Sequence, residues 1–187
     1  MDLFREEQLI ASIKSDPSQF VILFDAYYPL IFNYILHRVG LYEDAREIAS
    51  ETFLKAFINI GSFKYRGISI SYWIYKIATN EIQQYFRNRK RINTSLDQLI
   101  DSTSWDIIDP QTTESEKVAY ENELMNSKDF AFIREKIQLL SGKYQDVLTL
   151  RFFESKSIKE ISLILNKKEG TIKSLISRGI EKLKRLI

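Results

Sequence analysis

The C-terminal end of the chain carries the pattern that most restricts its fold. Two short segments with helical apolar spacing lie between residues 136 and 165, Asn166 marks a tight turn, and a longer basic helix is predicted from about 168 to 185. The apolar residues of that last helix recur every three or four positions on one face: Ile172, Ile176, Ile180, Leu183 and Ile187. This order is typical of a helix-turn-helix, whose second helix lies in the major groove of DNA, so we expect recognition and not turnover.

The net charge of +2 hides a division along the chain. Residues 1–92 hold 12 basic and 10 acidic side chains, residues 93–129 hold 2 and 9, and residues 130–187 hold 13 and 6. The middle stretch is also rich in serine and threonine, which is typical of a linker. We therefore expect two small domains, 1–92 and 130–187, joined by an acidic linker in which a weakly periodic helix is expected over residues 115–125.

The N-terminal part contains clear helix boundaries. Asp16 before Pro17 is typical of an N-cap followed by proline at the first helical position. Pro29 is expected to stop or restart that helix. A second helix is then expected over residues 30–39, closed by Gly40 in the left-handed conformation.

The clearest helix spans residues 43–60, where apolar residues keep helical spacing and acidic residues occupy the first turn. A polar and aromatic loop follows over residues 62–69, and a long helix is expected from 70 to 91, with four basic residues near its end. Cations neutralise phosphates and aromatic rings stack on unpaired bases, so the loop and helix suit a single strand better than an intact duplex. The predicted fold class is all-α, with two small helical domains.

Other classes of function find little support in the sequence. The chain contains no cysteine, no glycine-rich phosphate loop and no zinc-protease motif. The single histidine, His37, has no partner at ligand spacing, so we expect it to be structural or exposed. No catalytic residue, metal or cofactor is therefore expected. The first 14 residues lack the order of a signal peptide, and no run of about twenty apolar residues suggests membrane insertion, which indicates a cytoplasmic protein.

Six segments of the chain resemble the extracytoplasmic-function (ECF) sigma factors of bacterial RNA polymerase. Residues 24–30, 43–53 and 73–80 are similar to region 2 of that family, and residues 148–154, 157–161 and 170–174 are similar to region 4. The resemblance covers nearly all of the chain except its N-terminal end and the acidic linker. It implies a transcription initiation factor that binds core RNA polymerase and reads promoter DNA, both as a duplex and as a melted strand.

The resemblance also implies roles for particular residues. In the family, the helix equivalent to residues 43–60 docks on a coiled coil of the largest polymerase subunit. The resemblance implies contact with core polymerase for Glu47, Ser50, Glu51 and Leu54. It implies contact with the minus-ten element for Lys64, Tyr65, Arg66, Tyr72, Trp73, Lys76, Asn80, Gln84, Arg87, Arg89, Lys90 and Arg91. It implies contact with the minus-thirty-five element for Lys167, Lys168, Thr171, Lys173, Ser174, Ser177 and Arg178.

The resemblance further implies an anti-sigma factor as a partner, and we expect the free protein to be a monomer. Several positions depart from the usual family pattern: Glu47 and Ser50 stand where aspartate and glutamine are common, Gln84 where aspartate is frequent, Asn166 where a turn glycine is usual, and Leu175 where arginine is frequent. An arginine can read a guanine with two hydrogen bonds, so its replacement by leucine means that the promoter sequence cannot be carried over from relatives. Trp73, like other aromatic residues at helical spacing, is expected to be packed.

Two functions of other classes remain as alternatives. The first is a regulator that binds duplex DNA through the C-terminal helix-turn-helix alone, with the N-terminal domain used for dimerisation or sensing. It leaves the loop and basic helix over residues 62–91 without a role. The second is a nucleic-acid enzyme, which would require a cluster of acidic residues to hold a metal.

Overall fold

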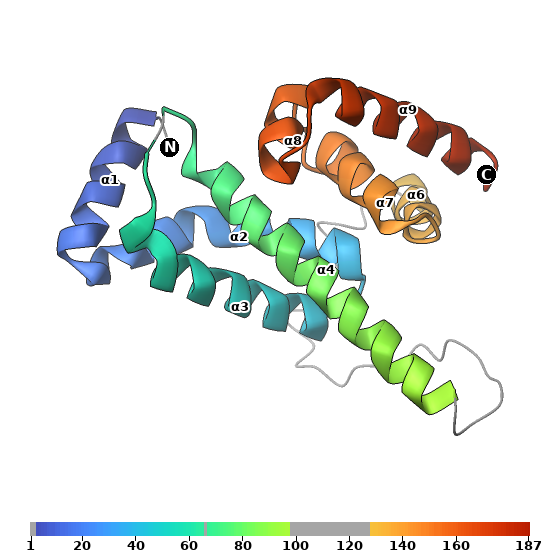
Figure 1. Cartoon of the computed structure of the whole chain (residues 1–187), viewed down its shortest axis with the longest axis horizontal. Helices are drawn as coiled ribbons and strands as arrows, with labels where there is room; N and C mark the ends of the chain where they lie inside the picture. Colours follow the sequence, from blue (N-terminus) through green and yellow to red (C-terminus); the bar gives the residue numbers. More distant parts are fainter. Residues whose placement is uncertain (1–2, 66, 98–127) are drawn as a thin grey trace.

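The computed structural model describes residues 3–65, 67–97 and 128–187, and within those ranges every regular element is a helix. The helices form two lobes (Figure 1). The N-terminal lobe contains α1 (Leu3–Ser15), η1 (Pro17–Gln19), α2 (Phe20–Val39), α3 (Tyr42–Asn59), η2 (Ile60–Ser62) and α4 (Ile70–Asp97). The C-terminal lobe contains α6 (Lys128–Gln138), α7 (Gly142–Leu148), the π-helical segment η3 (Thr149–Phe153), α8 (Ile158–Leu165) and α9 (Glu169–Lys184). The predicted all-α fold is confirmed, while the helix expected over residues 115–125 lies outside the described residues.

Helix α2 is the central helix of the N-terminal lobe and packs against both α3 and α4. It runs without interruption through Pro29, so the expectation that this proline stops or restarts the helix is wrong. Pro29 and Asp25, whose carbonyl loses its helical partner, both lie on the exposed side of α2, where water can satisfy that carbonyl. The segment Pro17–Val39 has the length and hydropathy of a membrane span. In this fold the apolar side chains of the segment, such as Leu23, form the core of the N-terminal lobe.

The boundaries of the neighbouring helices follow the sequence closely. Gly40 ends α2 with a φ of 80°, and its N–H donates to the carbonyl of Leu36 at 2.9 Å, as predicted for a left-handed cap. Helix α3 matches the helix predicted over residues 43–60 within one residue at each end. Helix α4 begins at Ile70 as predicted but continues past Arg91 to Asp97, into the segment assigned to the linker.

A buried carboxylate from α1 fixes the start of α4. Glu6 is 2% exposed, and its side chain accepts hydrogen bonds from the Ile70 N–H and the Ser69 hydroxyl, both at 2.8 Å, and from the Tyr27 hydroxyl. Anions are favourable at a helix N-terminus, where backbone N–H groups lack partners. Glu6 therefore joins α1 and α2 to the loop that precedes α4, although it lies outside the segments that resemble a known family.

The C-terminal lobe is built around the predicted helix-turn-helix. Ser157 and Glu160 form a capping box at the start of α8, and Asn166, with a φ of 50°, ends that helix in the predicted tight turn. Helix α9 places Ile172 in the core, fully buried. Gly179 faces α7 so closely that a β-carbon there would lie 3.2 Å from the Leu148 side chain. A larger residue at this position would require the Leu148 side chain to shift by a few tenths of an ångström.

The two lobes also pack against each other, which the sequence did not indicate. The C-terminal lobe lies along α4, with α8 against α4 and η3 against α2 (Figure 1). The contact places the C-terminal lobe on the side of α4 that carries many of the residues singled out from the sequence.

Replacing Glu6 by glutamine should destabilise the N-terminal lobe by about 1–3 kcal/mol, because the amide loses the charge and turns an N–H2 group toward hydrogen-bond donors. Chemical denaturation followed by circular dichroism measures this difference. The matched control is Glu7→Gln, at an exposed neighbouring position of the same helix. Equal stability of the two variants would contradict the role given to Glu6.

Candidate nucleic-acid interface

The outer face of α3 forms an acidic surface that ends in apolar side chains. Glu47, Ser50, Glu51 and Leu54 are all exposed and lie at helical spacing along one stripe. The opposite side of the helix is buried in the core through residues such as Ala49. Glu51, which is exposed, makes an ion pair at 3.2 Å with the partly exposed Lys55, and such pairs at the surface add little stability. Helix α3 therefore leaves its predicted contact residues available for a partner that combines positive charge with an apolar contact.

The apolar end of this stripe continues past the predicted residues. Leu54 is 52% exposed, and Phe57 and Ile58 follow it at 43% and 67%. Aromatic and aliphatic side chains that remain exposed beside a charged rim are typical of protein contact sites. The sequence analysis did not single out Phe57 or Ile58, because a helical stripe of apolar residues normally predicts the core.

An open cavity of about 810 Å³ lies between α3, the loop before α4, and α4 itself. We call it the aromatic pocket, lined by Lys55, Asn59, Ser62, Phe63, Lys64, Ile68, Tyr72, Trp73, Lys76, Ile77, Asn80, Glu81 and Leu163. The rings of Phe63 and Trp73 pack with their centroids 5.0 Å apart, and Trp73 is half-buried, so it both packs and lines the pocket. Flat rings and lysines around one cavity suit an unstacked base and its phosphates.

Tyr72 stands at the edge of the aromatic pocket and touches the other lobe. Its hydroxyl donates to the Glu160 carboxylate at 2.8 Å. Burial, together with the hydrogen bond and negative charge of Glu160, raises the pKa of Tyr72 to about 12. Tyr72 is therefore a neutral hydrogen-bond donor at physiological pH.

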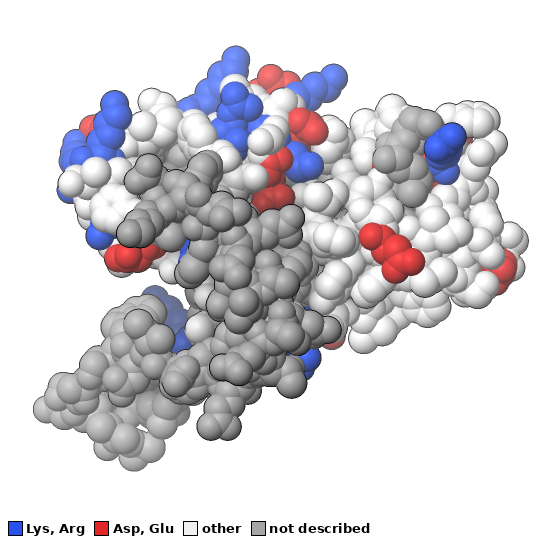
Figure 2. All heavy atoms as spheres, turned by 180° about the vertical axis from the view of Figure 1, so that it is seen from behind, with Lys and Arg blue, Asp and Glu red and all other residues white. Residues whose placement is uncertain are grey.

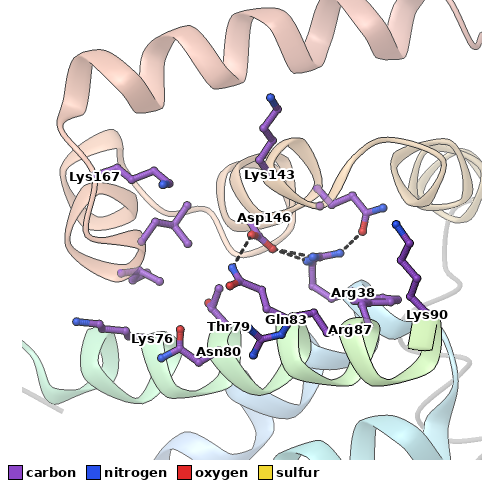
Figure 3. A pocket seen from close by; sticks show the side chains of 15 residues that line it. Arg38, Lys76, Thr79, Asn80, Gln83, Arg87, Lys90, Lys143, Asp146 and Lys167 are labelled. Atoms are coloured by element: carbon purple, nitrogen blue, oxygen red, sulfur yellow. Dashed lines mark hydrogen bonds and ion pairs between the residues drawn. The ribbon is translucent and has the colours of Figure 1, made fainter. Parts of the chain in front are cut away.

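A second cavity, of about 670 Å³, lies between α4 and the C-terminal lobe (Figure 3). We call it the basic cleft, lined by Arg38, Lys76, Thr79, Asn80, Gln83, Phe86, Arg87, Lys90, Gly142, Lys143, Gln145, Asp146, Ile164, Leu165 and Lys167. Lys76, Arg87 and Lys167 make no ion pair among the described residues. In Figure 3, Lys76, Asn80 and Arg87 extend from α4, while Lys167 comes from the opposite lobe. The cleft thus joins predicted minus-ten residues with one predicted minus-thirty-five residue.

Some predicted minus-ten residues lie away from both cavities. The Tyr65 hydroxyl donates to the Leu3 carbonyl at 2.9 Å, so Tyr65 ties the loop to α1. Arg89 lies 3.7 Å from the Asp44 carboxylate, on the side of α4 that faces α3. Gln84 is exposed and lines neither cavity. Arg66 and the side chain of Arg91 lie outside the described residues.

Helix α9 presents the remaining predicted residues to solvent. The exposed polar and basic side chains at the turn and along the helix are Lys167, Lys168, Thr171, Lys173, Ser174, Ser177 and Arg178. Leu175 is half-buried and packs against the core. Figure 2 shows lysines and arginines gathered over the C-terminal lobe, while the N-terminal lobe in the same view is mostly uncharged. The outward face of α9 has the shape and charge that a major groove accepts.

The contact between the lobes uses residues that the sequence analysis missed. Arg38, 2% exposed, donates to the Asp146 carboxylate from Nε at 3.0 Å and from Nη2 at 2.7 Å (Figure 3). His37, for which the sequence offered no partner, lies with Nδ1 3.3 Å from the Glu154 carboxylate. The expectation that His37 has no partner is therefore wrong. Periodicity carries no signal for such pairs, since their members are more than a hundred residues apart.

No group of three or more histidine, cysteine, aspartate or glutamate side chains in the described part of the chain could hold a metal ion.

Comparison with protein families gives two matches. Residues 23–92 match the family described as Sigma-70 region 2, and residues 133–183 match Sigma-70, region 4. The chain is similar to the ECF RNA polymerase sigma factor SigW of Bacillus subtilis, with 30% identity over 185 residues that cover 99% of this chain and 97% of SigW. It is also 31% identical over 166 residues to the ECF RNA polymerase sigma factor BldN of Streptomyces coelicolor, covering 88% of this chain but only 59% of BldN.

Solved structures share the arrangement of helices. CnrH in complex with the cytosolic domain of CnrY superposes with a TM-score of 0.68 at 14% identity, covering 99% of this chain and 97% of that chain. The sigma factor RpoE in complex with the anti-sigma factor NepR from Bartonella quintana superposes with a TM-score of 0.66 at 22% identity, covering 89% and 95%. At these identities the likeness establishes the fold.

Proposed function

Since this chain belongs to the ECF sigma factors of the sigma-70 family, which direct RNA polymerase to promoters, we propose how its surfaces divide that task. The observation that carries the proposal is the presence, in one chain, of a pocket suited to an unpaired strand and a helix suited to duplex DNA. A regulator that bound only duplex DNA would need neither the aromatic pocket nor the exposed face of α3. On this proposal the region 2 domain occupies residues 1–92 and the region 4 domain residues 130–187.

Core polymerase binds the outer face of α3. Glu47 and Glu51 contact basic side chains of the polymerase, and Leu54, extended by Phe57 and Ile58, supplies the apolar part of the contact. This division is supported by the exposure of all these residues and by the small energetic use that the free protein makes of them. Charged residues steer the encounter, while buried apolar side chains hold the complex.

The minus-ten element binds as a melted strand along α4. A base that leaves the duplex loses stacking and pairing, which costs a few kcal/mol, and a protein must return that energy through new stacking and hydrogen bonds. Phe63, Tyr72 and Trp73 supply rings and a hydroxyl at the aromatic pocket. Lys76 and Arg87 follow along α4 and neutralise phosphates of the same strand.

The minus-thirty-five element binds as a duplex on α9. Lys173, Ser174 and Arg178 reach the base edges or phosphates from the exposed side, and Ile172 anchors the helix in the lobe. The half-buried Leu175 gives no hydrogen bond to a base. The chain thus selects the promoter, and the polymerase supplies the chemistry in the cytoplasm, so we assign no catalytic residue or cofactor to the chain.

An anti-sigma factor is the second partner that we propose. Two solved structures that share this fold are complexes, CnrH with the cytosolic domain of CnrY and RpoE with the anti-sigma factor NepR. A partner of this kind would compete with polymerase for surfaces that are exposed here, such as the face of α3 that carries Leu54, Phe57 and Ile58.

Replacing both Glu47 and Glu51 by lysine should abolish binding to core polymerase, because like charges would then oppose each other across the contact. This binding is measured by co-elution of the purified chain with core polymerase in size-exclusion chromatography. Asp25→Lys, on the exposed side of α2, is the control for a charge reversal in the same lobe. Unchanged co-elution of the double variant would refute the assignment of α3.

Replacing Lys173, Ser174 and Arg178 together by alanine should weaken transcription from minus-thirty-five-dependent promoters by about tenfold or more, since each good base contact is worth about 1–3 kcal/mol. Binding to core polymerase should persist. Run-off transcription of genomic fragments by the reconstituted enzyme gives the readout, with Lys184→Ala at the far end of α9 as the control. Transcription equal to that of the unmodified chain would mean that another surface reads this element.

A further inference from the structure

Helix α1 lies outside the residues that match the region 2 family, 23–92, and the proposed function gives it no role. It nevertheless contacts the loop before α4, which the structure describes at residues 63–65 and 67–69. That loop supplies Phe63, Lys64 and Ile68 to the aromatic pocket. We propose that α1 is a positioning element for the melted strand, which acts through this loop and not by direct contact. The inference rests on the proposed function for the identity of the strand.

Helix α1 holds the first half of the loop through two hydrogen bonds. The ammonium of Lys14, in the last turn of α1, donates to the Phe63 carbonyl at 2.6 Å. The Tyr65 hydroxyl donates to the carbonyl of Leu3, the first residue of α1, at 2.9 Å. The Phe63 ring packs against Trp73 with the centroids 5.0 Å apart. The bond from Lys14 therefore fixes the backbone of a residue whose ring lines the pocket.

A carboxylate at a core position of α1 holds the end of the loop. Glu6, Ile10 and Ile13 recur at helical spacing and are buried, at 2%, 3% and 1% exposure. Glu6 accepts from the Ser69 hydroxyl and the Ile70 N–H, both at 2.8 Å. A buried charge costs free energy that its hydrogen bonds must offset, so an apolar side chain would pack α1 equally well. The acid at this position is explained by the loop that it holds.

The backbone of the loop does little to fix its own shape. In the described part of the loop, backbone-to-backbone hydrogen bonds lie only at the two ends. They join the Phe63 N–H to the Ile60 carbonyl at 3.1 Å and the Tyr72 N–H to the Ser69 carbonyl at 3.3 Å. Between them Gly67 has a φ of 69°, which glycine adopts at little cost. Such a segment keeps many conformations unless other elements hold it, so its order depends on α1.

A loop that is held before the strand arrives binds it more tightly. Extruding a base has a cost, and a pocket that must also become ordered returns less of that cost. None of the bonds from α1 to the loop reaches α3 or α9, which carry the proposed polymerase and duplex contacts. Loss of these bonds should therefore weaken binding of the melted strand and leave the other two contacts intact.

The test compares Glu6→Gln with Lys14→Met, each of which removes a charged partner of the loop. The matched controls are Glu7→Gln, at an exposed position next to Glu6, and Lys14→Arg, which keeps a charged donor. Hydrogen–deuterium exchange of peptides that cover the loop, measured on the free chain, reports how firmly the loop is held. Strand binding is measured on the complex with core polymerase. The probe is a fluorescent single strand with the non-template minus-ten sequence of a promoter that this complex transcribes.

Loop amides should exchange about tenfold faster in Glu6→Gln and about threefold faster in Lys14→Met, because the bond of Lys14 is open to water. Affinity for the single strand should fall by about the same factors. Co-elution with core polymerase and affinity for a duplex minus-thirty-five probe should not change, and both controls should behave as the unmodified chain. A merely structural role of α1 would not move the ratio of single-strand to duplex affinity.

Unchanged loop exchange in both Glu6→Gln and Lys14→Met would overturn the inference. Faster exchange with unchanged single-strand affinity would also overturn it, because the position of the loop would then not matter to binding. If Glu6→Gln folds poorly, Lys14→Met tests the same loop from an exposed position. Failure of the unmodified chain with core polymerase to bind the single strand would contradict the proposed function, while the exchange measurement would still decide whether α1 holds the loop.

Discussion

Arg38 and Asp146 meet between the two lobes, where their side chains are 2% and 7% exposed, and this ion pair helps to set how the surfaces of one lobe lie relative to those of the other. Removing one member of a buried pair typically costs about 3–5 kcal/mol, because the other charge is left without a partner. Separating the lobes has no such cost, because water reaches both ions. The pair therefore specifies how the two lobes meet without adding much to the strength of the contact.

In the N-terminal lobe, the irregular loop before α4 must be held in place beside the aromatic pocket. Glu6 provides the connection, since its carboxylate accepts from Tyr27 of α2 and from Ser69 and Ile70 at the start of α4. The loop before α4 contributes Phe63 and Lys64 to the aromatic pocket. A rigid pocket can return the cost of extruding a base, whereas a loose one would lose part of that energy in becoming ordered.

Local features of the fold were predictable from the sequence because they depend on neighbours along the chain. Gly40 and Asn166 end helices in the left-handed conformation, as their residue types indicate, and α3 follows its apolar spacing. Pro29 was misjudged because the cost of a proline in a helix depends on whether the carbonyl that loses its partner can reach water, which is a property of the packed lobe. The extension of α4 to Asp97 likewise has no capping signal in the sequence.

Of the candidate site, likewise, one part could be predicted from the sequence and another could not. The stripe on α3 and the exposed face of α9 could be found from helical periodicity, since each lies on one side of one helix. The pairs Arg38 with Asp146 and His37 with Glu154 could not, because they depend on how two lobes meet. Tyr65 and Arg89 were assigned to the minus-ten element by the family resemblance, and the sequence did not indicate that Tyr65 also bonds to α1 or that Arg89 lies beside Asp44 of α3.

The most direct test of this account is the distance between the lobes in the free protein. The chain has no cysteine, so Asp25→Cys in α2 and Lys184→Cys in α9 would carry the only two spin labels. Double electron–electron resonance should give one short, narrow distance distribution. With Asp146→Asn added, the distribution should broaden and move to longer distances, because Arg38 is left without its charged partner. A distribution that stays the same in that variant would contradict the account.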